Sequence, residues 1–405
     1  MAIESAVAGD TVLVSCDVVK EALALGKVIE RRTGVAPLVI TADSARWPEQ
    51  AAFIADPNSV SHQVVIYSPV ITSALSITSG HFSKHFGLFS GQVVPGDAIQ
   101  MLRRDRTARE FVIGLKNSEY RKSEVVEIEF RREMFNTENL LRGLSISDEA
   151  KDDIRRAIEL DNKPSALKLL QYTHCKNEAW LKDNIQNPLP STLLQQGFKV
   201  EVLERDECLS RSGFAAKNLG RKAAKWDTAQ KLVASKAAKM EVMETAKNAG
   251  TTSETEHFRV IRGRAEDVLG KHELSNADAE FWVEGEGEGK IKRFSKLHMD
   301  SNQNDDEIIV LDVIRPAVSK MVTTKDWRSE DSTELFDKLN AVRTQAIAIG
   351  LQMPAHATTA KAKQAAVTKI LGAFGLKTKK KDGGNSGDYY IITEESLQQM
   401  IGYIK

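Results

Sequence analysis

The chain has 405 residues, enough for two or three domains with well-buried cores. It carries 56 basic and 56 acidic residues, so its zero net charge neither indicates nor excludes a nucleic-acid partner. Three scattered cysteines exclude a disulfide scaffold and a structural zinc site, and the lack of an apolar run near ~20 residues excludes a membrane span. This composition favours a soluble protein of the reducing cytoplasm.

The first 115 residues show the pattern of an α/β domain. Apolar, β-rich runs alternate with helical patterns and cover residues 11–16, 37–41, 64–67, 86–89 and 111–115. The first helical pattern follows Asp17, which we expect to cap it, and ends at Gly34. Short strands that are apolar on both faces predict a parallel sheet covered by helices on both sides.

Residues 64–106 are the most informative stretch of the sequence. An apolar strand ends in Ser-Pro, and the run TSALSI, a second apolar run and the run QMLRRDR follow it. We expect a helix to begin at the first residue of QMLRRDR. In the whole stretch 64–106, the side chains that can bind a phosphate are, in chain order, Thr72, Ser73, Ser76, Gln100, Arg104 and Arg106.

This order resembles motifs V and VI of superfamily 2 helicases. The amino-acid sequences of the two motifs are similar to those of herpesvirus-type origin-binding helicases and of replication proteins of the cyanobacterial plasmid type. The resemblance covers residues 11–115 and implies a RecA-like lobe, the second of the two that hold ATP between them in a motor. It also implies replication of a plasmid, phage or mobile element, with host replication proteins as partners.

The resemblance implies roles for individual residues. Arg104 and Arg106 would be arginine fingers, which accelerate phosphoryl transfer about 10³–10⁵-fold in other NTPases. Asp105 departs from the pattern of origin-binding helicases, which usually have valine there, and its charge predicts ion pairing that orients the two arginines. Nucleotide would contact Ser76 and Gln100, and a DNA strand would contact Thr72, Ser73 and, at the motif IV position, Ser15. The open alternatives are a solvated basic helix face for the arginines and an ordinary turn for the hydroxyls.

The first lobe of such a motor supplies a phosphate loop and a magnesium-binding acid, and this sequence has neither. The triplet Asp148-Glu149-Ala150 stands at a predicted helix start and is interpreted as a cap. We therefore expect ATP and Mg²⁺ only through a separate or missing lobe, and no ATPase activity from the chain alone. No metal site is expected, because His81 and His85 have no acid near them in sequence.

The middle of the chain has mostly helical patterns from about residue 120 to 250. Strands are predicted at residues 127–132 and 308–313, a loop or hairpin at 284–289 and a helix at 332–349. Residues 211–247 contain nine Lys/Arg and three acids, which fits a solvated face and a DNA contact equally well. Trp180 and Trp226 would either stack on bases or pack in a core.

The tail predicts a helix over residues 358–374, strands at 376–381 and 389–393, and a last helix from Thr393. Helix, basic hairpin and helix is the order in which a winged-helix domain ends. Residues 358–381 hold seven lysines and no acid, which suits phosphate binding. The lysines expected to contact DNA are Lys369, Lys377, Lys379, Lys380 and Lys381. We expect the core of this domain to bury Val367, Ile370 and Leu371.

Four consecutive domains are predicted. They are a RecA-like lobe (1–118), a helical accessory region (119–250), a mixed α+β linker region (251–330) and a winged-helix-like DNA-binding domain (331–405). Three functions stay open: a helicase-type replication protein that lacks its phosphate-loop lobe, a non-catalytic DNA-binding initiator or regulator that keeps the lobe as a scaffold, and an α/β protein whose basic segments only solvate it.

Overall fold

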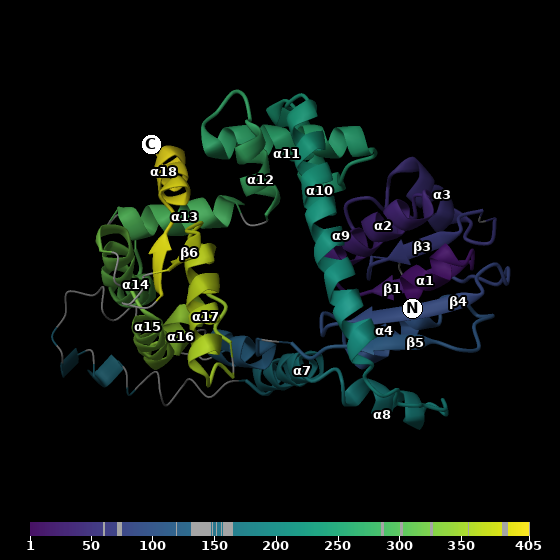
Figure 1. Cartoon of the computed structure of the whole chain (residues 1–405). Helices are drawn as coiled ribbons and strands as arrows, with labels where there is room; N and C mark the ends of the chain where they lie inside the picture. Colours follow the sequence, from purple (N-terminus) through teal and green to yellow (C-terminus); the bar gives the residue numbers. More distant parts are fainter. Residues whose placement is uncertain are drawn as a thin grey trace. The chain divides into compact units, whose positions relative to one another are not determined.

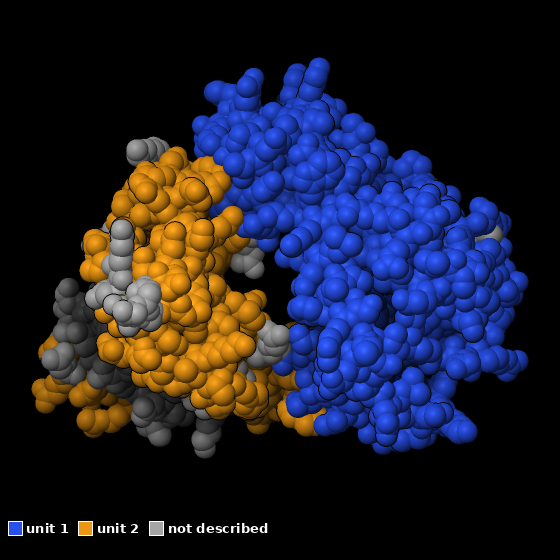
Figure 2. Space-filling view, viewed as in Figure 1, with its two compact units in different colours: residues 1–118, 184–288 blue, residues 119–183, 289–405 orange. Residues whose placement is uncertain are grey.

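The computed structural model describes the chain except for residues 60, 71–74, 119, 131–146, 148, 151, 155, 157–164, 285–286, 300–302, 325–326, 355, 383–387 and 405. The chain forms two compact units (Figure 2). Unit 1 comprises residues 1–118 and 184–288, and unit 2 comprises residues 119–183 and 289–405. Each unit is thus discontinuous in sequence, whereas the predicted domains are consecutive. No helix in the described ranges is long and apolar enough to cross a membrane.

Unit 1 contains a five-stranded, entirely parallel sheet with the order β2-β3-β1-β4-β5 (Figure 1). The strands are β1 (Val12–Cys16), β2 (Leu38–Ile40), β3 (Val64–Tyr67), β4 (Lys84–Phe89) and β5 (Val112–Leu115). All five predicted strands and their parallel pairing are confirmed, because each strand is short and carries apolar residues toward both faces. In the register of the sheet, Ser15 pairs with Tyr67 on one side and Gly87 on the other.

Helices cover both faces of this sheet. The helices of the first segment are α1 (Ala2–Val7), α2 (Val19–Thr33), α3 (Pro48–Ala55) and α4 (Pro95–Leu102). α1 and α2 pack on the face that carries Val12 and Val14, and α3 and α4 pack on the face that carries Leu13 and Tyr67. α2 ends at Gly34 as predicted, because the φ of 74° there favours glycine.

The second segment of unit 1 is helical. Its helices are α8 (Pro188–Gln195), α9 (Glu207–Ala234), α10 (Met240–Ala249), α11 (Glu254–Leu269) and α12 (Asn276–Val283). α8 joins α4 on its face of the sheet. α9 packs closely against α2, and a Cβ atom added at Gly220 would lie 2.7 Å from Cγ2 of Val28.

The described part of unit 2 is helical apart from one hairpin. Besides residues 122–130, its helices are α7 (Ala166–Asp183), α13 (Gly287–His298, from Gly289 onward), α14 (Asp305–Thr323), α15 (Ser329–Ala341), α16 (Arg343–Ala348), α17 (Ala360–Ala373) and α18 (Glu394–Tyr403). β6 (Thr378–Lys381) and β7 (Tyr389–Ile392) pair antiparallel. The predicted helix, hairpin and helix of the tail are confirmed, and the side chains of Thr359 and Thr393 cap the two helices.

Several predicted elements are wrong. Residues 127–130 are helical, and the rest of that predicted strand lies outside the described residues. Residues 308–313 lie inside α14, because Asn304 and Glu307 form a capping box that starts a helix before the β-branched run. Gln100 lies near the end of its helix, since α4 begins at Pro95, and proline is favoured at a first helical position.

Two further segments differ from expectation. The helix predicted over residues 332–349 is divided into α15 and α16, which meet at Val342. Residues 251–330, expected to mix helix and strand, form α11 to α14 in their described part. The run at residues 284–289 ends α12 and begins α13, and residues 285 and 286 lie outside the described residues.

Candidate nucleic-acid interface and the predicted motor residues

The structure joins the two motif segments of unit 1. Ile77 and Asp105 form a parallel bridge between them. The Ile77 N–H donates to the carbonyl of Arg104 (2.8 Å), and the Arg106 N–H donates to the carbonyl of Ile77 (2.8 Å). Segments that follow two different strands are therefore held side by side, although no side-chain contact of either arginine forms this bridge.

The two predicted finger arginines have opposite surroundings. Arg104 is only 6% exposed, and its charge lies near Tyr67, whose hydroxyl donates to the carbonyl of Met101. Burial raises the pKa of Tyr67, and the charge of Arg104 opposes that rise. Arg106 is exposed, as is Arg103. An arginine finger has to reach a nucleotide held by another lobe, so the burial of Arg104 argues against this role for it, whereas Arg106 is exposed.

Asp105 binds a histidine and a threonine. Its carboxylate lies 2.9 Å from Nε2 of His85, which is itself 8% exposed, and it accepts hydrogen bonds from Thr107 N–H (2.9 Å) and Oγ1 (2.6 Å). The predicted ion pairing of Asp105 with its arginine neighbours is thus replaced by contacts with His85 and Thr107. An acid does lie near His85, contrary to expectation, but the described residues contain no cluster of three side chains able to hold a metal.

The other predicted site residues of unit 1 are dispersed. Gln100 is exposed near the end of α4, and Ser76 is half-buried, with its carbonyl 3.4 Å from Nδ2 of Asn58. Ser15 is 2% exposed inside the sheet, where its hydroxyl donates to the carbonyl of Phe86 (3.3 Å). It is not presented to a DNA phosphate. Thr72 and Ser73 lie outside the described residues.

Asp17, which follows β1 directly, binds the loop after the neighbouring strand β4. Its carboxylate accepts hydrogen bonds from the backbone N–H groups of Ser90 (2.9 Å) and Gln92 (2.7 Å), in the loop after β4. The predicted helix cap is wrong, because Val18 is the N-cap of α2 and no side chain caps it. An internal carboxylate therefore occupies backbone donors at the sheet edge where ligands bind in many parallel α/β folds.

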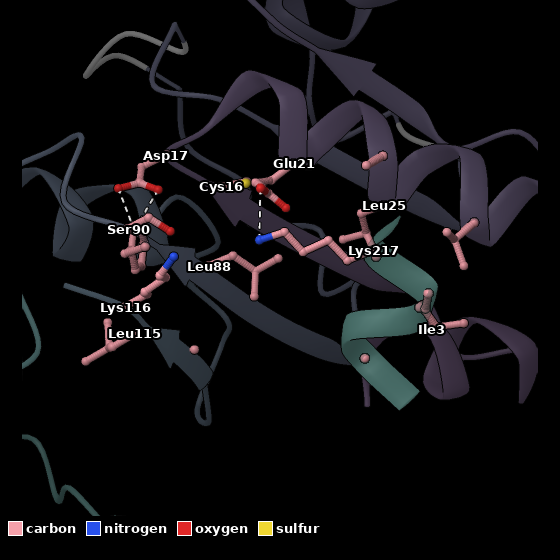
Figure 3. A pocket seen from close by; sticks show the side chains of 16 residues that line it. Ile3, Cys16, Asp17, Glu21, Leu25, Leu88, Ser90, Leu115, Lys116 and Lys217 are labelled. Carbon is pink, nitrogen blue, oxygen red and sulfur yellow. Dashed lines mark hydrogen bonds and ion pairs between the residues drawn. The ribbon is translucent and has the colours of Figure 1, made fainter. Parts of the chain in front are cut away.

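A cavity of about 320 Å³ lies beside this edge, between α2, α9 and the strands β4 and β5 (Figure 3). Its charged groups are already engaged, since Asp17 holds the Ser90 loop and Glu21 binds Lys217 at 2.9 Å. Burial raises the pKa of Cys16 to about 12, so its thiol is protonated at neutral pH and is a poor nucleophile.

The basic cluster of residues 211–247 is largely neutralised by acids. On α9, Lys217 and Arg221 bind Glu21 of α2, and Lys225 binds Glu284 at the end of α12. Four lysines of the cluster are exposed without such a contact in the described structure; they are Lys222, Lys236, Lys239 and Lys247. Ion pairs between packed helices therefore account for part of this cluster, and the choice between a solvated face and a DNA contact stays a prediction for its other lysines. Trp180 and Trp226 are 54% and 57% exposed, so neither is a core residue.

α17 separates an apolar face from a basic one. Val367, Ile370 and Leu371 are at most 2% exposed, which confirms that they pack in the core. On the other face Lys361 and Lys369 are exposed, and the Lys369 ammonium lies 3.4 Å from the hydroxyl of Tyr120. Lys363 is less able to bind a phosphate than an unpaired lysine, because its ammonium group donates to the carboxylate of Asp337 at 2.6 Å.

The hairpin continues this basic surface. Lys377, Lys379 and Lys380 are exposed and Lys381 is half-buried. Lys380 forms an ion pair with Asp388, which raises the pKa of Lys380. Thr378 of β6 donates a hydrogen bond to Thr368 of α17 (3.3 Å), so the hairpin lies directly beside the helix (Figure 1).

Two partners of the hairpin were missed by sequence reasoning. The Tyr390 N–H donates to the carbonyl of Trp327 (2.8 Å), and the Arg328 guanidinium lies 5.8 Å from the centre of the Tyr389 ring. Both contacts join residues about sixty positions apart, and no local pattern predicts them.

No known family model matches this sequence, and no similar protein was found among curated ones.

Proposed function

We propose that this chain is a non-catalytic DNA-binding protein, an initiator or regulator of replication, whose unit 2 binds duplex DNA with α17 and the β6–β7 hairpin. The observation that carries the proposal is the presence of exposed lysines on both elements, which a hydrogen bond between Thr378 and Thr368 joins. Lysines on two adjacent elements can contact two stretches of phosphate backbone while the helix enters a groove.

The order of elements in unit 2 supports a winged-helix arrangement. α14, α15 and α17 precede a hairpin, and the backbone of Trp327, between α14 and α15, hydrogen-bonds to β7. The buried residues of α17 anchor the helix, and Lys361 and Lys369 lie on its exposed face. The resemblance of residues 68–106 to origin-binding helicases supports replication of a plasmid, phage or mobile element as the setting.

The test is a quadruple variant in which Lys377, Lys379, Lys380 and Lys381 are changed to alanine. Fluorescence anisotropy with a labelled duplex, repeated across salt concentrations, gives both the affinity and its salt dependence. We expect weaker binding for every sequence, and a log–log salt slope that is shallower by up to roughly 0.9 for each DNA phosphate that the variant no longer neutralises. Unchanged affinity and slope would overturn the proposal.

The matched control removes the same charge from unit 1. It changes Lys222, Lys236, Lys239 and Lys247 to alanine, which are also exposed. We expect this variant to bind DNA as the unchanged protein does. An equal reduction of affinity in both variants would mean that only net charge matters, and it would also contradict an interface formed by α17 and the hairpin.

A second candidate function is the motor lobe, favoured by the Ile77–Asp105 bridge that joins the two motif segments and by the exposure of Arg106. In this case a separate phosphate-loop lobe would supply the ATP and Mg²⁺ sites. The chain alone should then show no DNA-stimulated ATPase activity. When a phosphate-loop lobe is added, Arg106→Ala should reduce turnover about 10³-fold or more, whereas Arg103→Ala should not.

A further inference from the structure

The exposed face of α17 has a distinct composition. Lys361, Ala365, Thr368 and Lys369 are all exposed and follow one another at helical spacing. The two lysines flank the two small residues. A helix with small residues at the centre of its outer face can approach the floor of a groove closely, while the flanking lysines reach phosphates or guanine edges.

The side chains on the exposed face of α17 limit which DNA bases this helix can recognise. Bidentate recognition of adenine is made by Asn or Gln, and bidentate recognition of guanine by Arg or Lys, here only by the lysines at the two ends of the face. α17, all of which is described, contains one carboxamide, Gln364, and no arginine. Gln364 is 8% exposed and lies on the buried side, so it cannot reach a base. What remains at the centre of the face is the methyl group of Ala365 and the γ-methyl of Thr368.

We propose that α17 reads the C5-methyl groups of thymine in the major groove, through Thr368 and Ala365. This inference rests on the proposed DNA-binding function. Alanine and the threonine methyl are among the side-chain groups that make apolar contacts with the thymine methyl. The hydroxyl of Thr368 is engaged by Thr378 at 3.3 Å, which orients the side chain and leaves its methyl as the group for base contact.

The test compares duplexes that differ only in C5 methyl groups. Binding of the full chain is measured to an A·T-rich duplex with thymine and to the same duplex with uracil in every thymine position. Burying one methyl contributes about 0.8 kcal/mol, which corresponds to roughly a fourfold change in affinity per methyl group. We expect affinity to fall about 4- to 15-fold on replacing thymine with uracil, if one or two methyl groups are buried.

Two variants at Thr368 isolate the methyl group. Thr368→Ser keeps the hydroxyl and removes the methyl, so it should bind the thymine and uracil duplexes with more nearly equal affinity. Thr368→Val keeps a methyl and loses the hydroxyl, so it should still discriminate. Equal discrimination in the serine variant and the unchanged protein would show that the Thr368 methyl does not contact thymine, and it would overturn the inference.

The remaining outcomes separate the inference from the function on which it rests. Equal affinity for thymine and uracil duplexes, with weaker binding by the quadruple hairpin variant, overturns the methyl recognition and leaves the DNA-binding function. No binding to any duplex overturns both. A third probe carries uracil and 5-methylcytosine. Tighter binding to that probe alone, with thymine and uracil equal, would assign the methyl recognition to methylated cytosine and overturn the thymine assignment.

Discussion

Helices α9 and α17 both come from lysine-rich stretches of sequence, and the fold uses their charges differently. Lys217 and Arg221 of α9 bind Glu21, which is contributed by a helix nearly 200 residues earlier in the chain. Lys361 of α17 is exposed, and Lys369 of the same helix meets the hydroxyl and the ring of Tyr120. The density of basic residues is therefore a poor guide to DNA binding until the acids that face them are known.

The largest effect on stability is expected where α9 meets α2. In Gly220→Ala the new Cβ would collide with the backbone of Ala24 and with Val28, so we expect hydrogen exchange in α2 and α9 to report a loss of about 1–3 kcal/mol. Gly213→Ala, in the same helix, meets nothing within 4 Å and should gain about 0.5–1 kcal/mol from helix propensity. Equal effects of the two substitutions would show that α9 does not pack on α2 as described.

A smaller effect is expected from the charges of α9. The double variant Lys217→Ala/Arg221→Ala leaves Glu21, whose side chain is 15% exposed, without its two cations. The lysine and arginine are 37% and 49% exposed, so solvent weakens both pairs, and we expect a loss of roughly 1 kcal/mol. DNA affinity and salt slope should not change. Weaker DNA binding in this variant would contradict the view that the basic residues of α9 form ion pairs within the protein while those of α17 contact DNA.

The smallest effect concerns the buried side of α17. The side-chain nitrogen and oxygen of Gln364 are buried and make no hydrogen bond. An unsatisfied buried amide is destabilising, so Gln364→Met should raise the local stability of α17 by roughly 0.5–1 kcal/mol in hydrogen exchange. DNA affinity should stay the same, since this side chain does not face the proposed groove. A destabilised Gln364→Met variant would indicate that the amide has a partner in solution.

The parallel sheet of unit 1 was predictable from sequence because strand signals are local, whereas the addition of residues 184–288 to the same unit was not predicted. Apolar runs flanked by helical patterns are sufficient to predict a parallel sheet, and all five runs form strands. The same signal failed at residues 308–313, where the capping residues before the run dominate. Composition alone does not show that a helix start outweighs a β-branched run.

The candidate site was less predictable because burial depends on distant residues. Ser15 is buried on the central strand beside β4, where the carbonyl of Phe86 accepts its hydrogen bond, and Arg104 is buried near Tyr67. Neither neighbour is close in sequence. The tail was easier, because its lysines, caps and hairpin are contiguous and its apolar residues follow helical spacing.

The discontinuous construction of unit 2 has a consequence for its synthesis. Glu124 forms an ion pair with Arg343, 219 residues later, and Asp183 accepts hydrogen bonds from the backbone of Lys122 and Ser123. The segment 119–183 leaves the ribosome before its partner segment exists. At a synthesis rate of about 5–20 residues per second, roughly 10–40 s pass between the addition of Glu124 and that of Arg343. During that interval Leu167 and Leu170, which stay 65% and 66% exposed even in the finished fold, are available to chaperones or to other nascent chains.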